Sequence, residues 1–128
     1  MKPVLSFLSA MIAAMKNLIN SLSLVNRGKV REIYSVDDEH LLIVTSDRIS
    51  AFDVILPTPI PEKGEILTRI SNFWFAKTRT IIPNHISDIP LKDVLTDPHE
   101  FAWAEHRSIV VKRLQPLPVE AIVRGYLI

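Results

Sequence analysis

The sequence contains no cysteine and only three glycines, and it has no excess of either charge. Without cysteine there is no disulfide framework, thiolate nucleophile or cysteine zinc site, which is compatible with the cytoplasm. The glycines form neither the Walker pattern nor the multi-glycine dinucleotide fingerprint. Fifteen Lys and Arg against fourteen Asp and Glu give a net charge of +1, which does not favour a nucleic-acid partner. Any anion must therefore be bound locally.

The apolar stretch near the N-terminus is too short to be a membrane span. Residues 4–15 are interrupted by Ser6 and Ser9, whereas a span needs about 20 apolar residues. We predict that residues 1–24 are an extension that forms an amphipathic helix, because apolar residues recur at helical spacing at Leu8, Ile12, Met15 and Ile19. The alternative is a signal peptide leading an exported or membrane-associated small protein, which determination of the mature N-terminus would reveal.

The remaining residues, 25–128, are enough for one domain with a hydrophobic core. Strand-like runs at residues 29–35 and 41–45 flank an acidic turn, and this pattern predicts a β-hairpin. Residues 46–64 contain three prolines, which exclude a continuous helix. We expect an ordered, extended loop there, with a short strand near residues 54–56.

The second half of the chain is predicted to contain one long helix followed by two strands. Apolar residues at spacings of three and four, at Ile66, Ile70, Phe73, Trp74 and Ile81, predict a helix from Gly64 to Pro83 with its aromatic face in the core. Residues 84–107 suggest only short irregular pieces. Residues 109–114 and 119–124 are rich in β-branched side chains and are predicted to be strands.

Two polar segments are candidates for binding. In residues 27–31 a glycine lies between basic residues, so its backbone N–H groups and cations could close over phosphates, or the segment could be an ordinary solvated turn. Residues 45–53 place two aspartates, Arg48 and three hydroxyls directly after a strand, which is typical of a binding loop. The alternative is a turn in which Arg48 pairs with Asp47 or Asp53. The four histidines are scattered without zinc-ligand spacing.

Seven segments, taken in their order along the chain, resemble the SAICAR synthetase family, whose members are also called phosphoribosylaminoimidazole-succinocarboxamide synthases. The resemblance begins near Leu18 and continues to the last residue. Each segment alone has low specificity, but the ordered set is specific. The segments are residues 27–34, 45–53, 61–65, 73–75, 83–85, 110–114 and 118–127. Glu62 departs from the glycine that many bacterial members carry.

The resemblance implies an ATP-dependent ligase of purine biosynthesis. Members of the family join the carboxylate of the imidazole ribonucleotide CAIR to the amine of L-aspartate, using ATP and Mg²⁺. The proposed route passes through an acyl phosphate. Such chemistry asks the protein mainly for positioning and for cations near the transferred phosphoryl group.

The resemblance also implies a two-lobed α+β fold similar to the kinase and ATP-grasp arrangement. This chain would supply the first lobe, which is rich in antiparallel sheet, and the second lobe would be missing. The implied ATP-binding residues form two groups. Gly28, Lys29, Val30 and Arg31 would cover the phosphates, with Lys29 and Arg31 catalytic, and Lys112, Arg113, Leu114 and Pro116 would form a shelf for adenine. Val30 and the strand at residues 41–44 would supply the other apolar wall of the nucleotide site.

Four further residues are implied on the side of the imidazole nucleotide. Arg124 would bind its phosphate or carboxylate, because a guanidinium suits a bidentate contact, or else it would form a structural ion pair. Ser50 and Asp53 would bind or orient the same substrate. Glu120 would share a sheet face with Arg124 and either point into the cleft or pair with that arginine.

Further expectations follow if this chain supplies the first lobe alone. We assign no metal ligand to this chain, and we expect it to have no ligase activity by itself. Because the cleft needs walls from both lobes, nucleotide affinity should be weak or absent. The alternative function is a non-catalytic nucleotide-binding remnant. The apolar surface that the second lobe would cover should favour self-association.

Overall fold

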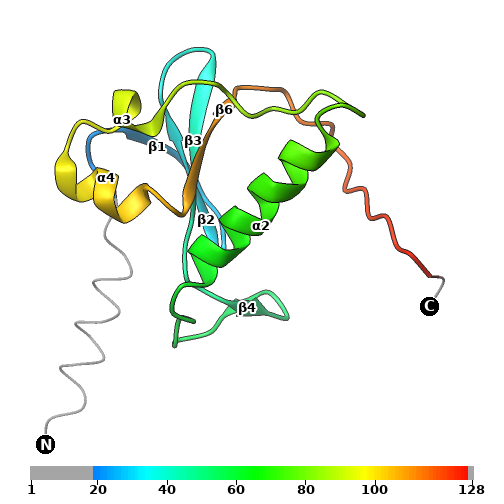
Figure 1. Cartoon of the computed structure of the whole chain (residues 1–128). Helices are drawn as coiled ribbons and strands as arrows, with labels where there is room; N and C mark the ends of the chain where they lie inside the picture. The colour runs from blue at the N-terminus through cyan, green and yellow to red at the C-terminus, as the bar shows by residue number, and fades with distance from the viewer. Residues whose placement is uncertain (1–18, 127–128) are drawn as a thin grey trace, which may run out of the picture.

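The computed structural model describes residues 19–126, which form an antiparallel sheet with helices on both faces (Figure 1). The sheet has the strand order β1-β2-β3-β6, and a separate two-stranded sheet pairs β4 with β5. The strands are β1 (Ser23–Arg27), β2 (Arg31–Ser35), β3 (His40–Thr45), β4 (Ser50–Ala51), β5 (Val54–Ile55) and β6 (Ser108–Lys112). The helices are α2 (Lys63–Thr78), α3 (Leu91–Val94) and α4 (Pro98–Ala104). None of the described helices is long and apolar enough to cross a membrane.

The predicted hairpin is confirmed as β2 and β3. Arg31 pairs with Thr45 at one end and Ser35 pairs with Leu41 at the other. The acidic turn closes the hairpin because the carboxylate of Asp37 accepts a hydrogen bond from the backbone N–H of Glu39 at 2.7 Å. This bond and the contact with His40 hold the pKa of Asp37 below its usual value. The short strand expected near residues 54–56 is also present, as β5.

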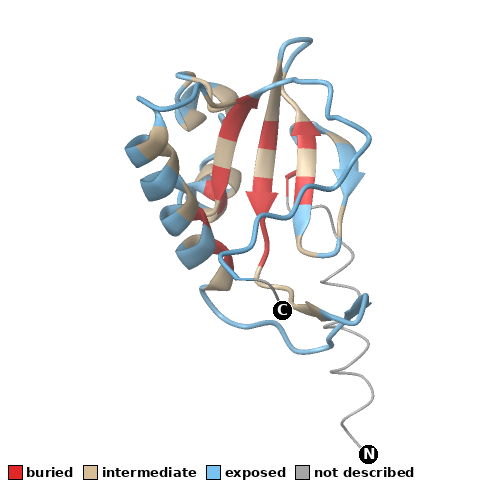
Figure 2. Ribbon diagram, turned by 90° about the vertical axis from the view of Figure 1, so that its right-hand side faces the viewer, coloured by how far each residue is buried: buried red, intermediate tan, exposed pale blue. Residues whose placement is uncertain are grey.

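The core lies on one face of the sheet, because alternate residues of a strand point to opposite faces. Buried side chains from the strands meet those of α3, α4 and residues 19–24 there, and Figure 2 shows the burial concentrated in the strands. The fully buried members are Ile19, Tyr34, Leu42, Val44, Leu95, Ala104 and Val110. Helix α2 lies over the opposite face, where Ile43 and Ile109 point.

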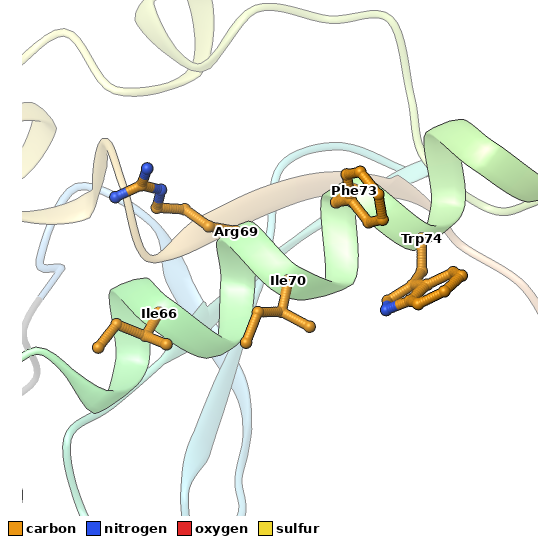
Figure 3. A pocket seen from close by; sticks show the side chains of 5 residues that line it. All are labelled: Ile66, Arg69, Ile70, Phe73 and Trp74. Atoms are coloured by element: carbon orange, nitrogen blue, oxygen red, sulfur yellow. The ribbon is translucent and has the colours of Figure 1, made fainter.

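The expectation that the aromatic face of α2 is buried was wrong. Phe73 and Trp74 are 53% and 59% exposed, and Ile66 and Ile70 lie beside them on the same outward surface. The face toward the sheet carries Gly64 and Thr68, which are buried. Small residues on this face allow the helix and the sheet to approach closely. The apolar stripe of Ile66, Ile70, Phe73 and Trp74 therefore faces outward. The outward stripe lines a shallow hollow of about 420 Å³ (Figure 3).

Helix α2 ends at Thr78, before the expected end at Pro83, and residues 79–82 form turns. Two short helices, α3 and α4, occupy the stretch where only irregular pieces were expected. Asp97 caps α4 by accepting hydrogen bonds from the N–H groups of His99 and Glu100, and Pro98 takes the first helical position.

The N-terminal boundary lies differently from the expected division after residue 24. β1 begins at Ser23, and Ile19 is fully buried in the core. Glu100 of α4 accepts a hydrogen bond from the N–H of Asn20 at 2.7 Å, which fixes this entry segment. The amphipathic helix expected over residues 1–24 falls mostly on residues 1–18, which lie outside the described residues.

One of the two strands predicted near the C-terminus forms, and the other does not. Residues 109–114 correspond to β6, which pairs with β3. Residues 119–124 were predicted to be a strand, and this was wrong, because residues 113–126 are exposed and contain no helix or strand. β-Branched residues favour a strand only where a neighbouring strand can pair with them, and no described strand lies beside this segment.

Candidate functional site

The turn between β1 and β2 presents the predicted phosphate-binding residues. The N–H of Gly28 donates to the carbonyl of Arg31 at 2.8 Å and closes the turn. Arg48 donates to the carbonyl oxygens of Gly28 and Lys29, at 3.2 and 3.0 Å. The carbonyl of Val30 accepts from the N–H of Ser46 at 2.9 Å. The turn is therefore fixed by the segment that follows β3.

The β4–β5 hairpin joins this turn through one ion pair. The ammonium of Lys29 lies 2.5 Å from the carboxylate of Asp53, and this contact holds the pKa of Asp53 below its usual value. Asp53 and Phe52 have positive φ angles of 66° and 48° at the tip of the hairpin. Ser50 belongs to β4 and pairs with Ile55. Lys29, which is predicted to bind ATP, thus contacts Asp53, which is predicted to bind the imidazole nucleotide.

Arg31 points away from this ion pair. It lines a hollow of about 230 Å³ between the sheet and α2, together with Thr45, Thr68 and Ser71. The hydroxyl of Thr68 is buried in this hollow and has no hydrogen-bond partner among the described residues. The hollow therefore combines a guanidinium with one unsatisfied hydroxyl beside the apolar side chain of Ile43.

The predicted adenine shelf lies at the other end of the sheet. Lys112 ends β6 and pairs with His40, next to the β2–β3 turn. Arg113 is held by that turn, because its guanidinium donates to the hydroxyl of Ser35 at 2.6 Å. Leu114 and Pro116 are exposed. The five residues of β2 separate this end from the Gly28–Lys29 turn by about 13 Å, which is four steps of about 3.3 Å.

The expected apolar wall of the nucleotide site is only partly available. Leu42 and Val44 of the predicted stretch 41–44 point into the core on the other face. Leu41 and Ile43 are half-buried and point to the face that α2 covers in part. Val30 is half-buried in the turn.

Glu120 and Arg124 are not brought to the site. Both are exposed in the segment without a strand, so the shared sheet face predicted for them is absent. Neither makes a hydrogen bond or an ion pair within residues 19–126. The alternative interpretation, an ion pair between them, is therefore also absent from the described part of the chain.

A buried carboxylate beneath the turn escaped the sequence analysis. Glu32 is only 1% exposed and accepts from Arg48 at 3.0 Å, Arg27 at 3.2 Å and the hydroxyl of Tyr34 at 2.5 Å. Arg48 therefore pairs with Glu32, and the alternative pairing with Asp47 or Asp53 was wrong. A charged residue at an inward position of a strand was the available signal, since buried charges are normally paired.

A second missed pair fixes the start of α2. Asp47 accepts a hydrogen bond from the N–H of Gly64 at 2.8 Å, and Arg107 contacts Asp47 at 3.1 Å. Arg107 also lies 2.7 Å from Glu65. These partners are distant in sequence, so local spacing could not reveal them.

Comparison with known proteins identifies the family of this chain. The sequence pattern that defines SAICAR synthetase matches residues 24–128. The chain belongs to the SAICAR synthetase family. It is 60% identical over 113 residues to the phosphoribosylaminoimidazole-succinocarboxamide synthase of Methylobacillus flagellatus, covering 88% of this chain and 38% of that protein. The corresponding protein of Thioalkalivibrio sulfidiphilus is 62% identical over 110 residues, which are 86% of this chain and 37% of that protein.

Solved structures agree with this membership of the SAICAR synthetase family. A SAICAR synthase superposes with a TM-score of 0.79 at 43% identity, covering 89% of this chain and 40% of its own. The SAICAR synthase of Saccharomyces cerevisiae, solved with SAICAR, superposes with a TM-score of 0.68 at 42% identity over 77% of this chain and 35% of its own. The chain thus has the fold of part of a SAICAR synthetase and spans about two fifths of the length of these relatives.

Proposed function

We propose that this chain supplies the ATP-binding lobe of a phosphoribosylaminoimidazole-succinocarboxamide synthase. In the proposed reaction a carboxylate oxygen of CAIR attacks the γ-phosphorus of ATP and releases ADP. The amine of L-aspartate then attacks the acyl phosphate carbon, loses a proton and expels phosphate, which leaves the amide of SAICAR. Membership of the family and the identity to the Methylobacillus flagellatus protein support this assignment.

The observation that carries the proposal is the anchored Gly28–Lys29 turn beside two cations. Lys29 and Arg31 lie at the same end of the sheet and would neutralise phosphate charge as it moves to the leaving group. Lys29 points toward the β4–β5 hairpin and Arg31 points into the hollow beside α2. The two side chains would therefore contact different parts of the triphosphate, and the backbone of the turn would also contact it.

The base would lie toward the opposite end of the sheet. An extended nucleotide along the α2 face of β2 and β3 would place adenine near Lys112, Arg113, Leu114 and Pro116. This segment is fixed in place, because the N–H of Lys112 donates to the carbonyl of His85 at 2.8 Å and the N–H of Arg113 donates to the carbonyl of Glu39 at 2.6 Å. The base would therefore pack on the segment and would not bind these two N–H groups. Half-buried Leu41 would pack against the base.

The imidazole nucleotide and L-aspartate would approach from the β4–β5 hairpin. Asp53 and Ser50 lie there, and the Lys29–Asp53 ion pair would connect the substrate side with the phosphate side. Arg124 and Glu120 would join the site only when the segment that carries them pairs with further chain. Their exposure in residues 113–126 is consistent with that requirement.

Magnesium is not assigned to residues of this chain. Among residues 19–126 no group of three or more histidine, aspartate or glutamate side chains is arranged to hold a metal ion. The site would also lack the wall that a second lobe supplies, because in the described part of the chain only α2 lies over the nucleotide face of the sheet. We therefore propose that the chain alone has no ligase activity and that it acts in the cytoplasm as part of a larger catalytic unit.

A titration followed by NMR tests the nucleotide assignment. The ¹⁵N-labelled chain is titrated with ATP and, in parallel, with adenosine. The anchored turn favours weak affinity over none, so we expect saturable shifts in the millimolar range at the amides of Lys29 and Arg31 with ATP alone, and at Lys112 and Leu114 with both ligands. Shifts confined to other parts of the chain, or no saturable shift, would contradict the assignment.

A further inference from the structure

We propose that Arg48 is a positioning residue that orients the backbone of the Gly28–Lys29 turn toward the phosphates of the nucleotide. The proposal rests on the proposed function, because it concerns the same phosphate site. Arg48 itself points to the turn's carbonyl oxygens and to Glu32, so it would act through the backbone and not by contact with ATP.

The argument begins with the geometry of the peptide bond. In a planar trans peptide the carbonyl and the following N–H point in opposite directions. Arg48 draws the carbonyls of Gly28 and Lys29 toward itself, at 3.2 and 3.0 Å. The N–H groups of Lys29 and Val30 must therefore point away from Arg48. Neither N–H has a hydrogen-bond partner among residues 19–126, so two adjacent donors stay available to an anion.

The orientation matters because a turn presents either carbonyl oxygens or N–H groups to a ligand. Carbonyl oxygens repel phosphate, whereas successive N–H groups form an anion-binding concavity. The chain has three glycines, and only Gly28 lies in this turn. The turn therefore lacks the glycine-rich backbone that phosphate loops use for the same purpose. Arg48 would supply from outside the turn the orientation that such loops obtain from their own sequence.

Arg48 is itself held rigidly enough for this role. Its guanidinium is anchored on the buried carboxylate of Glu32 at 3.0 Å, and its side chain is 17% exposed. The ammonium of Lys63 at the start of α2 donates to its carbonyl at 3.1 Å. Three acceptors around one planar guanidinium match its donor geometry, which a lysine ammonium cannot reproduce.

The variant Arg48→Lys tests the proposal, because it keeps the charge and removes the fork of donors. In the nucleotide-free chain we expect the ¹⁵N order parameters of Lys29 and Val30 to fall from about 0.85 to below about 0.6. We expect the dissociation constant for ATP to rise about tenfold in the NMR titration, while that for adenosine changes less than twofold. A purely structural role would weaken both ligands equally.

The matched control is Arg107→Lys. Arg107 is also a partly buried arginine, at 11% exposed, with two carboxylate partners, but it makes no contact with the turn. It should lower the melting temperature and leave the ratio of ATP to adenosine affinity unchanged. If Arg48→Lys does not fold, Glu32→Gln releases the anchor of Arg48 and should give the same ATP-selective loss.

Three results would overturn the proposal: unchanged order parameters, unchanged ATP affinity, or equal losses for ATP and adenosine in Arg48→Lys. A different result separates this inference from the proposed function. If the unmodified chain shows no saturable shift with ATP, the nucleotide assignment fails. The order parameters of Lys29 and Val30 then decide by themselves whether Arg48 fixes the turn.

Discussion

At the scale of single residues, Tyr34 and Glu32 form the polar centre of an otherwise apolar core. Tyr34 is fully buried, and its hydroxyl donates to Glu32 at 2.5 Å. Burial first of all, and then the hydrogen bond to Glu32 and the negative charge of that carboxylate, together raise the pKa of Tyr34 from 10.0 to about 12. The stability of the folded chain therefore depends on the protonation of Tyr34 at alkaline pH.

Replacing Tyr34 by Phe should flatten the loss of stability at high pH. The pKa is 10.0 in the unfolded chain and about 12 in the folded one, so Tyr34 contributes fully below pH 10 and loses its contribution as pH rises to 12. Urea unfolding from pH 9 to 12 measures the difference. Tyr126→Phe is the control, because Tyr126 is 86% exposed. Parallel pH curves for Tyr34→Phe and the unmodified chain would contradict the expectation.

Gly64→Ala should destabilise the chain by about 1–3 kcal/mol, because it overpacks a tight contact. An added Cβ would lie 2.4 Å from the backbone carbonyl oxygen of Thr45, and neither backbone can move freely. Gly125→Ala is the matched control, since its Cβ would meet nothing within 4 Å. Denaturant midpoints of the two variants provide the comparison, and equal midpoints would show that α2 does not approach β3 this closely.

At the scale of elements, sequence periodicity identified most segments but not their surroundings. The β2–β3 hairpin and β6 followed from alternation and turn chemistry. The stripe of Ile66, Ile70 and Phe73 located α2 correctly but not its orientation, because periodicity shows which residues share a face and not what that face contacts. Residues 119–124 failed as a strand because pairing depends on a neighbour that local sequence does not specify.

The site shows the same division between local and distant information. The Gly28–Arg31 turn and the 45–53 segment could be found from residue types and order. The partners of Arg48 and Asp47 could not, since Glu32 and Gly64 lie 16 and 17 residues away from them along the chain. Ion pairs of this kind depend on how strands and helices pack together.

The helix α4 provides a prediction at this scale. Asp97→Ala should cost about 1 kcal/mol, because the cap accepts hydrogen bonds from two otherwise unsatisfied N–H groups. Those two bonds also hold the pKa of Asp97 below its usual value. Asp88→Ala, at an exposed position outside any helix, should change stability by less than about 0.5 kcal/mol. Equal unfolding free energies for the two variants would contradict the capping role.

At the scale of the whole molecule, many large apolar side chains are exposed in the described part of the chain. The outward face of α2 carries Ile66, Ile70, Phe73 and Trp74, and the segment after β6 adds Leu117, Val119, Ile122 and Val123. Large contiguous patches of this kind mark surfaces that associate. We attribute them to contacts that the remaining three fifths of a SAICAR synthetase would make.

The double variant Ile70→Glu and Trp74→Glu should therefore reduce self-association of the chain. Both side chains lie on the shallow hollow of α2, so two charges there would oppose burial against a second copy (Figure 3). Sedimentation velocity at several concentrations measures the change. Val54→Glu, at an exposed apolar position on β5, is the control. Unchanged association in the double variant would exclude this face.

The most direct test of the central claim is turnover by a chimaera. Residues 19–126 of this chain would replace the matching stretch of the Methylobacillus flagellatus synthase, which is 60% identical over the aligned region. The account predicts formation of SAICAR from CAIR, L-aspartate and ATP, with a loss of at least about 100-fold in kcat/KM for Lys29→Met, because one phosphate-binding cation is removed. A folded chimaera without turnover, or one indifferent to Lys29→Met, would contradict the claim that these residues form the ATP-binding lobe.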